Sequence, residues 1–198
     1  MLVTPNLTST ESLLIHYSAP TLCEIKPANL FTLSESQIQN VDLEKWKSKL
    51  QIQNLNLIYF KTSSNRWMIF IYNHCWVRQI ISDSLIQAYL RGKGYENPLD
   101  THQTLKELFS RIKNSKSFPH EIGFFLGYPI EDVIAFEENK GQNCKYCGYW
   151  KSYSNPSEAK SCCAQYKCCS QICKQLFEEG LSVPQIIKKY KEAVNNAA

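Results

Sequence analysis

The chain has 198 residues, of which 43% are hydrophobic and 20% charged, and its formal net charge is +4. This composition is typical of a globular chain and excludes disordered and collagen-like chains. The charge is too small to indicate a dedicated nucleic-acid binder. The longest apolar runs are too short for a membrane span, and the first residues lack the regions of a secretory signal. We therefore expect a cytoplasmic protein without a membrane segment.

Hydrophobic periodicity predicts helices in the N-terminal part of the chain and a β-hairpin between them. The first helix is expected to end at Ala19-Pro20 because proline interrupts helical hydrogen bonding. A polar turn at residues 62–65 separates the two β-rich segments of the hairpin. In chain order, the predicted segments are a helix over residues 10–18, extended pieces over 21–25 and 29–33, a helix from Ser34 or Ser36 to about Gln51, strands over 55–61 and 67–72, and helices over 75–90 and 100–113.

From Phe118 onward the pattern predicts only helices. We therefore predict an α+β fold, in which a small N-terminal sheet with a β-hairpin is packed by helices and is followed by a helical, cysteine-rich C-terminal third. The predicted regions are 1–117 (α+β) and 118–198 (helical). We expect them to form one continuous domain.

Residues 119–139 have the spacing of a helix-turn-helix. Apolar residues stand at positions 122, 126, 130 and 133, and glycines at 123 and 127. Pro129 opens the second helix. This segment holds five acidic residues and no Lys or Arg. Phosphates would repel the acidic side chains, so nucleic-acid binding is disfavoured here. The alternative is a tight helical corner whose apolar side chains face the core. Binding of a protein partner by this segment is a further alternative.

His120 and Glu121 are adjacent and could act as a general acid/base pair in a small-molecule enzyme. This hypothesis predicts a concave pocket that contains His120. The alternative is that His120 only hydrogen-bonds a helix start. A thiol is the other candidate for the catalytic group of such an enzyme.

Nine cysteines are present, and seven of them lie between residues 144 and 173. An odd count without a signal peptide argues against an extracellular disulfide framework and favours metal binding or thiol redox chemistry. The alternative is that these cysteines are small apolar core residues, since free cysteine is among the most buried residue types. Cys23 and Cys75, taken alone, are expected to be such core residues.

Cys144 and Cys147 form a Cys-x-x-Cys-Gly pattern that is typical of the first half of a zinc site. A helix predicted from Pro156 to Glu179 carries Cys169 and Cys173 at i and i+4, on one face. The four thiols could hold zinc or an iron–sulfur cluster, provided that their sulfurs lie within about 4 Å of one another. Thiol redox or sensing, or an apolar helix face, are the alternatives for the same cysteines.

Four runs carry a resemblance to a known family: residues 19–22, residues 26–31, the run PHEIGFFLGYP at 119–129 and the run CKYCGYWK at 144–151. Together they resemble a bacterial family classed as a domain of unknown function, over about residues 16–180. The resemblance implies no activity, cofactor or catalytic residue. It does point to His16, Lys26 and Asn29, in a run around two prolines, as further candidate functional residues.

Overall fold

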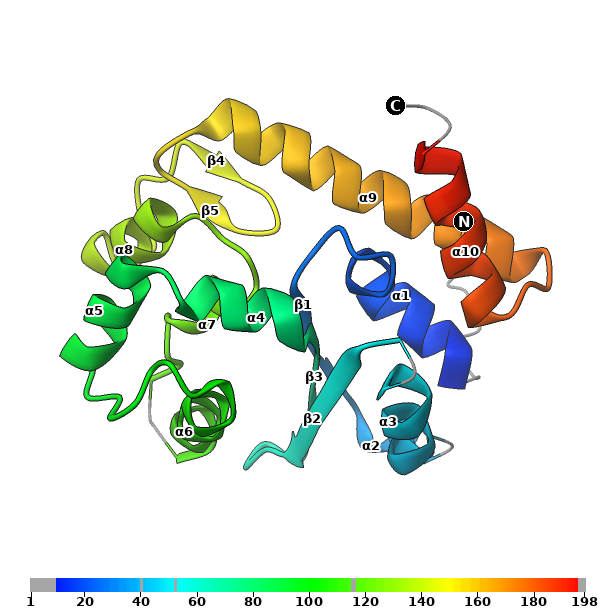
Figure 1. Ribbon diagram of the computed structural model, residues 1–198, viewed down its shortest axis with the longest axis horizontal. Coiled ribbons are helices and arrows are strands. Elements are labelled where there is room, and N and C mark those ends of the chain that lie inside the picture. The colour runs from blue at the N-terminus through cyan, green and yellow to red at the C-terminus, as the bar shows by residue number, and fades with distance from the viewer. Residues whose placement is uncertain (1–9, 40, 52, 115–116, 196–198) are drawn as a thin grey trace. The chain divides into compact units, whose positions relative to one another are not determined.

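The computed structural model describes residues 10–39, 41–51, 53–114 and 117–195. The chain forms two compact units, which are described separately (Figure 1). Unit 1 comprises Met1–Tyr72 and Tyr166–Ala198, and unit 2 comprises Asn73–Gln165. The long helix α9 (Pro156–Glu178) belongs to both, because it begins in unit 2 and ends in unit 1. No helix in the described parts of the chain is both long and apolar enough to cross a membrane.

Unit 1 contains a three-stranded sheet with the strand order β1-β3-β2. β1 pairs antiparallel with β3 from Ala28 opposite Tyr72 to Leu33 opposite Trp67. The predicted hairpin and the extended segment 29–33 are therefore confirmed, and the α+β class with them. The elements of unit 1 are α1 (Thr10–Leu22), β1 (Ala28–Leu33), α2 (Glu35–Ile38), α3 (Leu43–Gln51), β2 (Leu55–Lys61), β3 (Trp67–Asn73, whose last residue lies in unit 2), the second part of α9 and α10 (Val183–Asn195).

The core of unit 1 joins residues from both ends of the chain. Helix α1 packs against β1, α3 against β2, and α10 against α1. The buried face of α9 in this unit consists of Tyr166, Cys169, Cys173 and Leu176, which repeat at helical spacing. Burial of these faces, together with strand residues such as Ile69 and Ile71, supplies the hydrophobic stabilisation of the unit.

Two predicted helices of unit 1 differ from the structure. Helix α1 continues through Pro20 to Leu22, because Ala19, Pro20 and Leu22 are buried and their burial outweighs the hydrogen bond that proline removes. The chain reverses at Glu24, whose φ is 58°. The helix predicted to run to Gln51 is divided into α2 and α3. Ser34 caps α2 through a capping box with Gln37.

Unit 2 is mostly helical. Its helices are α4 (His74–Ile81), α5 (Ser84–Gly92), α6 (Thr101–Asn114), α7 (Ile122–Phe125), α8 (Ile130–Glu138) and the first part of α9. The helix predicted over 75–90 is interrupted, since the Asp83 side chain accepts hydrogen bonds from the N–H groups of Leu85 and Ile86 and starts a new helix. Helix α6 lies where it was predicted.

The predicted corner between α7 and α8 is present. Gly127 has a φ of +81°, a conformation that favours glycine, and turns the chain out of α7. Gly123 lies against α8, where an added Cβ would come within 2.8 Å of Val133. Close contact between the two helices therefore depends on the glycine at position 123.

The expectation that only helices follow Phe118 is wrong. A hairpin of two short strands, β4 (Tyr146–Cys147) and β5 (Lys151–Ser152), precedes α9. Its strands have two residues each, too few for alternation of polar and apolar residues to reveal. Asp132 of α8 holds the chain after β5, because its carboxylate accepts hydrogen bonds from the N–H groups of Tyr153 and Ser154, each at 2.8 Å.

Candidate metal centre

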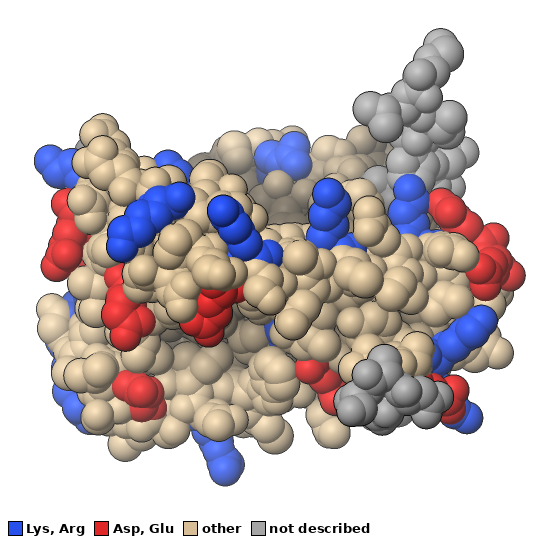
Figure 2. Space-filling model, turned by 90° about the horizontal axis from the view of Figure 1, so that it is seen from above, with Lys and Arg blue, Asp and Glu red and all other residues tan. Residues whose placement is uncertain are grey.

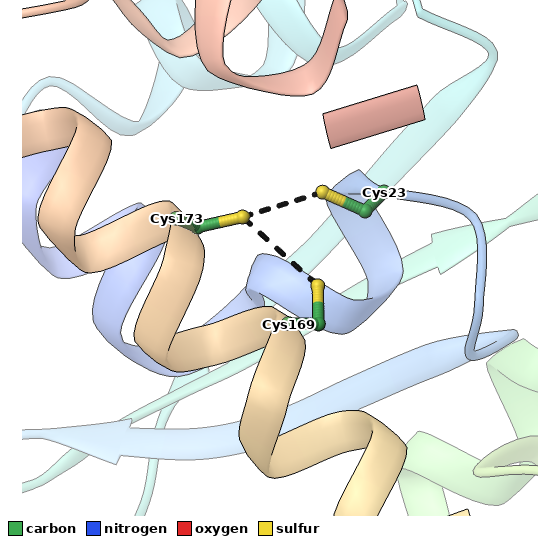
Figure 3. Close-up of side chains that lie close together, drawn as sticks. All are labelled: Cys23, Cys169 and Cys173. Carbon is green, nitrogen blue, oxygen red and sulfur yellow. Dashed lines mark hydrogen bonds between the residues drawn. The ribbon is translucent and has the colours of Figure 1, made fainter. Parts of the chain in front are cut away.

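Three cysteine sulfurs meet inside unit 1, as Figure 3 shows. Cys23 follows the last turn of α1, and Cys169 and Cys173 lie one turn apart on α9. The Cys23 and Cys173 sulfurs are 3.4 Å apart, and those of Cys169 and Cys173 are 4.0 Å apart. All three sulfurs lie within 4.8 Å of one another, and their residues are 3%, 0% and 0% exposed. We call these three residues the thiol cluster.

The local structure explains why the sulfurs converge. Residues at i and i+4 lie on one face of a helix, so Cys169 and Cys173 point to the same place. The backbone N–H of Cys23 bonds to the carbonyl of Ala19 at 2.9 Å, which fixes Cys23 at the end of α1. All three belong to the same hydrophobic core.

The electrostatics of the thiol cluster single out one thiol. Hydrogen bonds from Cys169 and Cys23 stabilise the thiolate of Cys173 and lower the pKa of that thiol. Hydrogen bonding raises the pKa of Cys23, chiefly through Cys169, and the pKa of Cys169, chiefly through Cys173. The Tyr190 hydroxyl is also hydrogen-bonded to Cys169, and burial is the main cause of the raised pKa of Tyr190. Hydrogen bonding within the cluster thus favours the thiolate form of Cys173.

The separations of the sulfurs match those in a metal site. With metal–sulfur bonds of about 2.3 Å, sulfurs lie about 3.8 Å apart in a tetrahedral site and about 4.0 Å apart in a trigonal one. In the thiol cluster the Cys23–Cys173 separation of 3.4 Å is shorter than these values, and the Cys169–Cys173 separation of 4.0 Å equals the trigonal one. The three sulfurs, all within 4.8 Å of one another, are therefore placed where they could hold a metal ion.

Sequence reasoning identified two of these three residues. The structure brings Cys169 and Cys173 together, as their spacing predicts. The other two predicted ligands, Cys144 and Cys147, lie in unit 2, so the four-cysteine site stays a prediction. Cys23 is buried in the core as expected, but its part in the cluster was missed. The same expectation for Cys75 is wrong, because that thiol is exposed. Cys23 is 150 positions away from Cys173, and no local spacing could reveal that contact.

Cys147 lies in β4 and is exposed, whereas Cys144 precedes the strand and is half-buried. A third thiol, that of Cys163 in α9, connects this helix to the hairpin. The N–H of Tyr149 donates to the Cys163 sulfur at 3.4 Å. Gly148 is required here, because an added Cβ would lie 2.7 Å from that sulfur. The Cys-x-x-Cys-Gly run thus packs closely on the start of α9.

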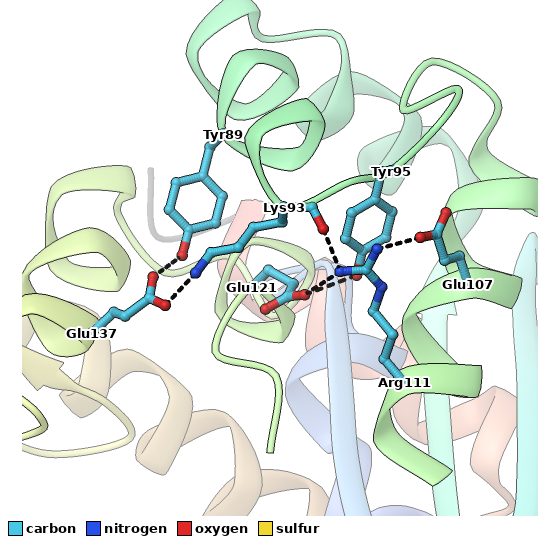
Figure 4. A network of polar contacts seen from close by, with 7 residues as sticks. All are labelled: Tyr89, Lys93, Tyr95, Glu107, Arg111, Glu121 and Glu137. Carbon is cyan, nitrogen blue, oxygen red and sulfur yellow. Dashed lines mark hydrogen bonds and ion pairs between the residues drawn. The ribbon is translucent and has the colours of Figure 1, made fainter. Parts of the chain in front are cut away.

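His120 and Glu121 have separate surroundings in unit 2. His120 lines a cavity, as the enzyme hypothesis predicts, and its ring contacts Phe136 with a centroid distance of 5.0 Å. Glu121 is buried in a different environment, where it accepts a hydrogen bond from the Tyr95 hydroxyl at 3.0 Å and pairs with Arg111 at 3.8 Å. Figure 4 shows this polar network, in which Arg111 also pairs with Glu107. The structure therefore gives the two side chains different partners, and a catalytic role for either one stays a prediction.

Two of the remaining candidates lie in unit 1. Lys26 is buried, and its ammonium nitrogen lies 5.7 Å from the centre of the Tyr166 ring, which is a cation–π contact. His16 is exposed on α1 and contacts Tyr17 edge to face. Partial desolvation lowers the pKa of His16, and the charge of Lys174 lowers it further.

Charged side chains are mixed on the face of the molecule drawn in Figure 2, where Lys and Arg side chains are interspersed with Asp and Glu. Two of the four acidic residues of α8 contact other parts of unit 2. Asp132 accepts a hydrogen bond from the chain after β5, and Glu137 accepts one from Tyr89 and pairs with Lys93.

Comparisons with known proteins place the chain in a family. Neither the curated proteins nor the solved structures gave a match. Residues 14–187 match a family that is described as "Protein of unknown function (DUF3793)". This match covers most of the chain, including all three residues of the thiol cluster and the hairpin of unit 2. The chain therefore belongs to the DUF3793 family of proteins of unknown function.

Proposed function

We propose that the protein binds one thiophilic metal ion in unit 1, through the sulfurs of Cys23, Cys169 and Cys173. The observation that carries this proposal is the convergence of three buried sulfurs within 4.8 Å. Thiolates prefer soft or borderline ions such as Cu(I) and Zn(II). The low pKa of Cys173 supports the proposal, because a metal ligand must be deprotonated.

The number of ligands favours a single ion over a cluster. Iron–sulfur clusters are commonly held by four cysteines, and the thiol cluster supplies three among the described residues. A structural zinc ion also takes four ligands, so zinc would need one further donor. A monovalent copper ion is satisfied by three thiolates in a plane. We therefore rank Cu(I) first, zinc second and an iron–sulfur cluster third.

A second candidate function is thiol redox sensing, which the short distance between Cys23 and Cys173 favours. Their sulfurs are 3.4 Å apart, and a disulfide needs about 2.05 Å. Oxidation would join these two sulfurs and pass two electrons and two protons to a small disulfide such as oxidised glutathione. Bound metal and a disulfide exclude each other, because both use the same sulfurs.

The test is the metal content of the full-length protein purified without oxygen, measured by elemental analysis. Binding in the thiol cluster predicts one ion per chain, lost in Cys23→Ala. Cys75→Ala and Cys168→Ala serve as matched controls, because both thiols are exposed, and both variants should keep the ion. Full metal content in Cys23→Ala would overturn the proposal.

The predicted four-cysteine site is distinguished by a second variant. Cys144→Ser combined with Cys147→Ser should leave the metal content unchanged if the ion is held by the thiol cluster. Loss of the ion in this variant, with retention in Cys23→Ala, would assign the site to Cys144, Cys147, Cys169 and Cys173 instead. A metal-free protein in which Cys23 and Cys173 are linked after mild oxidation would support the redox function.

A further inference from the structure

Unit 2 contains a cavity of about 380 Å³ between the α7–α8 corner and the β4–β5 hairpin. Its size falls within the range of about 300 to 1,000 Å³ that is usual for small-molecule sites. Phe118, 46% exposed, and Tyr149, 44% exposed, both line it and leave apolar surface open to solvent. This cavity lies wholly in unit 2, so it is independent of the thiol cluster.

Aromatic side chains form a rigid wall of the cavity. Tyr128 and Trp150 stack with their ring centroids 5.2 Å apart and their planes at 21°. The Tyr128 hydroxyl donates to the Tyr149 carbonyl at 3.1 Å, and the Trp150 indole N–H donates to Asp132 at 2.7 Å. Both rings are therefore held in place before any ligand arrives. Such flat walls favour a flat aromatic ligand.

Lys151 is a positively charged residue in the lining of the cavity. Its ammonium nitrogen donates to the Gly141 carbonyl at 2.6 Å and lies 5.9 Å from the centre of the Phe136 ring. An ammonium group has three donors, so hydrogen-bonding capacity remains for a ligand. His120, which contacts the same ring, adds a further nitrogen-bearing side chain to this side of the cavity.

The acidic residue that lines the cavity does not offset this charge. Asp132 is buried, and its carboxylate accepts hydrogen bonds from the N–H groups of Tyr153 and Ser154, the Ser154 hydroxyl and the Trp150 indole. Its charge is thus compensated by four donors. What the cavity offers to a ligand is an apolar wall with a cationic donor beside it.

We propose that unit 2 binds a flat aromatic molecule with an acidic group, with its ring against the Tyr128–Trp150 wall and its acidic group at Lys151. Charge-assisted hydrogen bonds of this kind are stronger than neutral ones and fix the orientation of the ligand. The proposal goes beyond metal binding, because it assigns a second site in another unit of the chain.

The test is a fluorescence titration of the full chain with anilinonaphthalene sulfonate, an aromatic acid whose emission rises in apolar sites. Uncharged N-phenylnaphthylamine is the comparison probe. Lys151→Met removes the charge and keeps an apolar side chain of similar length. Lys145→Met is the matched control, because Lys145 lies in the same hairpin and does not line the cavity.

We expect one sulfonate bound per chain, with a Kd about tenfold higher in Lys151→Met, since one charge-assisted contact is lost. Lys145→Met should leave that Kd unchanged, and the uncharged probe should bind both variants and the original chain alike. Binding of the sulfonate that is unaffected by Lys151→Met, or that does not saturate at one per chain, would overturn the proposal.

A second measurement covers the case in which Lys151→Met does not fold. Acetylation of lysines in the unaltered chain is followed by mass spectrometry, with and without the sulfonate probe. Protection of Lys151 by the probe, with Lys145 modified equally in both samples, supports the site. Equal modification of Lys151 in both samples contradicts it.

Discussion

The sulfur of Cys23 lies 3.4 Å from that of Cys173, although 150 positions separate the two residues in the chain. This contact joins the end of α1 to the face of α9, in the hydrophobic core of unit 1. Any ion or disulfide formed there would link the N-terminal helix to the C-terminal part of the chain. Metal binding or oxidation at the thiol cluster should therefore change the stability of unit 1.

Metal removal should lower the stability of unit 1. An ion that binds only the folded state, at a free concentration a hundredfold above its Kd, adds about 2.7 kcal/mol to the free energy of unfolding. We expect a chelator to lower the unfolding temperature of the original chain. Cys173→Ala should unfold at one temperature with or without the chelator. A chelator effect of equal size in both proteins would contradict this prediction.

Asp132→Ala should destabilise unit 2, because it leaves the N–H groups of Tyr153 and Ser154 without their acceptor. Hydrogen bonds to a charged group contribute about 1.5 to 3 kcal/mol each, and we expect a total loss of about 3 kcal/mol. Urea unfolding followed by tryptophan fluorescence measures it. Glu131→Ala, at the neighbouring exposed position, is the control and should change stability by less than about 0.5 kcal/mol.

The Asp132 carboxylate also predicts that the stability of unit 2 depends on pH. Burial raises the pKa of Asp132, but hydrogen bonds from Ser154, Trp150 and Tyr153 outweigh it and hold the pKa below its usual value. A depressed pKa in the folded state means that the stabilisation is fully present above the ordinary Asp value, about 3.9, and is lost as the pH falls through the folded value.

Acid titration of unfolding stability tests this dependence. We expect the original chain to lose stability below about pH 4, and Asp132→Asn to lose less over the same range. Parallel curves for the two proteins would show that other carboxyl groups govern the acid response.

Tyr95→Phe should cost about 1 to 2 kcal/mol, because it removes the hydroxyl that donates to the buried carboxylate of Glu121 at 3.0 Å. Combining it with Glu121→Ala in a double-mutant cycle should reveal coupling of at least about 0.5 kcal/mol. Neither change should affect binding of the sulfonate probe, because neither residue lines the cavity. Additive effects on stability would contradict the contact.

Two glycines predict opposite outcomes on substitution by alanine. At Gly148 an added Cβ would lie 2.7 Å from the Cys163 sulfur and 2.7 Å from the Tyr146 ring, so Gly148→Ala should destabilise the hairpin by about 1 to 3 kcal/mol. At Gly92 an added Cβ would meet no atom of the described residues within 4 Å apart from its chain neighbours and the backbone of its own helix. Gly92→Ala in α5 should therefore be neutral or stabilising by up to about 1 kcal/mol. Thermal unfolding of both variants checks the sign of each change.

The elements that sequence predicts well are those with a sustained local pattern. The β2–β3 hairpin has two β-rich runs around a polar turn, and α6 has apolar residues at helical spacing over 14 residues. Helix α1 was predicted too short, since local reasoning sees Pro20 as a stop, whereas burial of the neighbouring residues keeps the helix intact. The β4–β5 hairpin was missed because its strands have two residues each. The chain after β5 is held by Asp132 of α8, which lies in an earlier element and gives no local signal.

The candidate site shows the same limit. The pairing of Cys169 with Cys173 follows from helix geometry alone, and so it could be predicted. Cys23 carries no such signal, because only the packing of α1 in the core of unit 1 brings it to α9. His120 was expected in a concave pocket and lies in one. Its neighbour Glu121 points into a separate polar network, because adjacent residues in an irregular segment need not share a direction.

Unit 1 is interrupted in the chain: it stops at Tyr72 and resumes at Tyr166. During synthesis, all of Asn73–Gln165 is therefore made before the ribosome reaches Cys169. Domains generally fold as units in the order in which they are made. All residues of unit 2 are therefore synthesised before unit 1 is complete. The core of unit 1 lacks α9 and α10 until synthesis passes unit 2. A nascent chain halted before Tyr166 would hold Cys23 without either of its two sulfur partners.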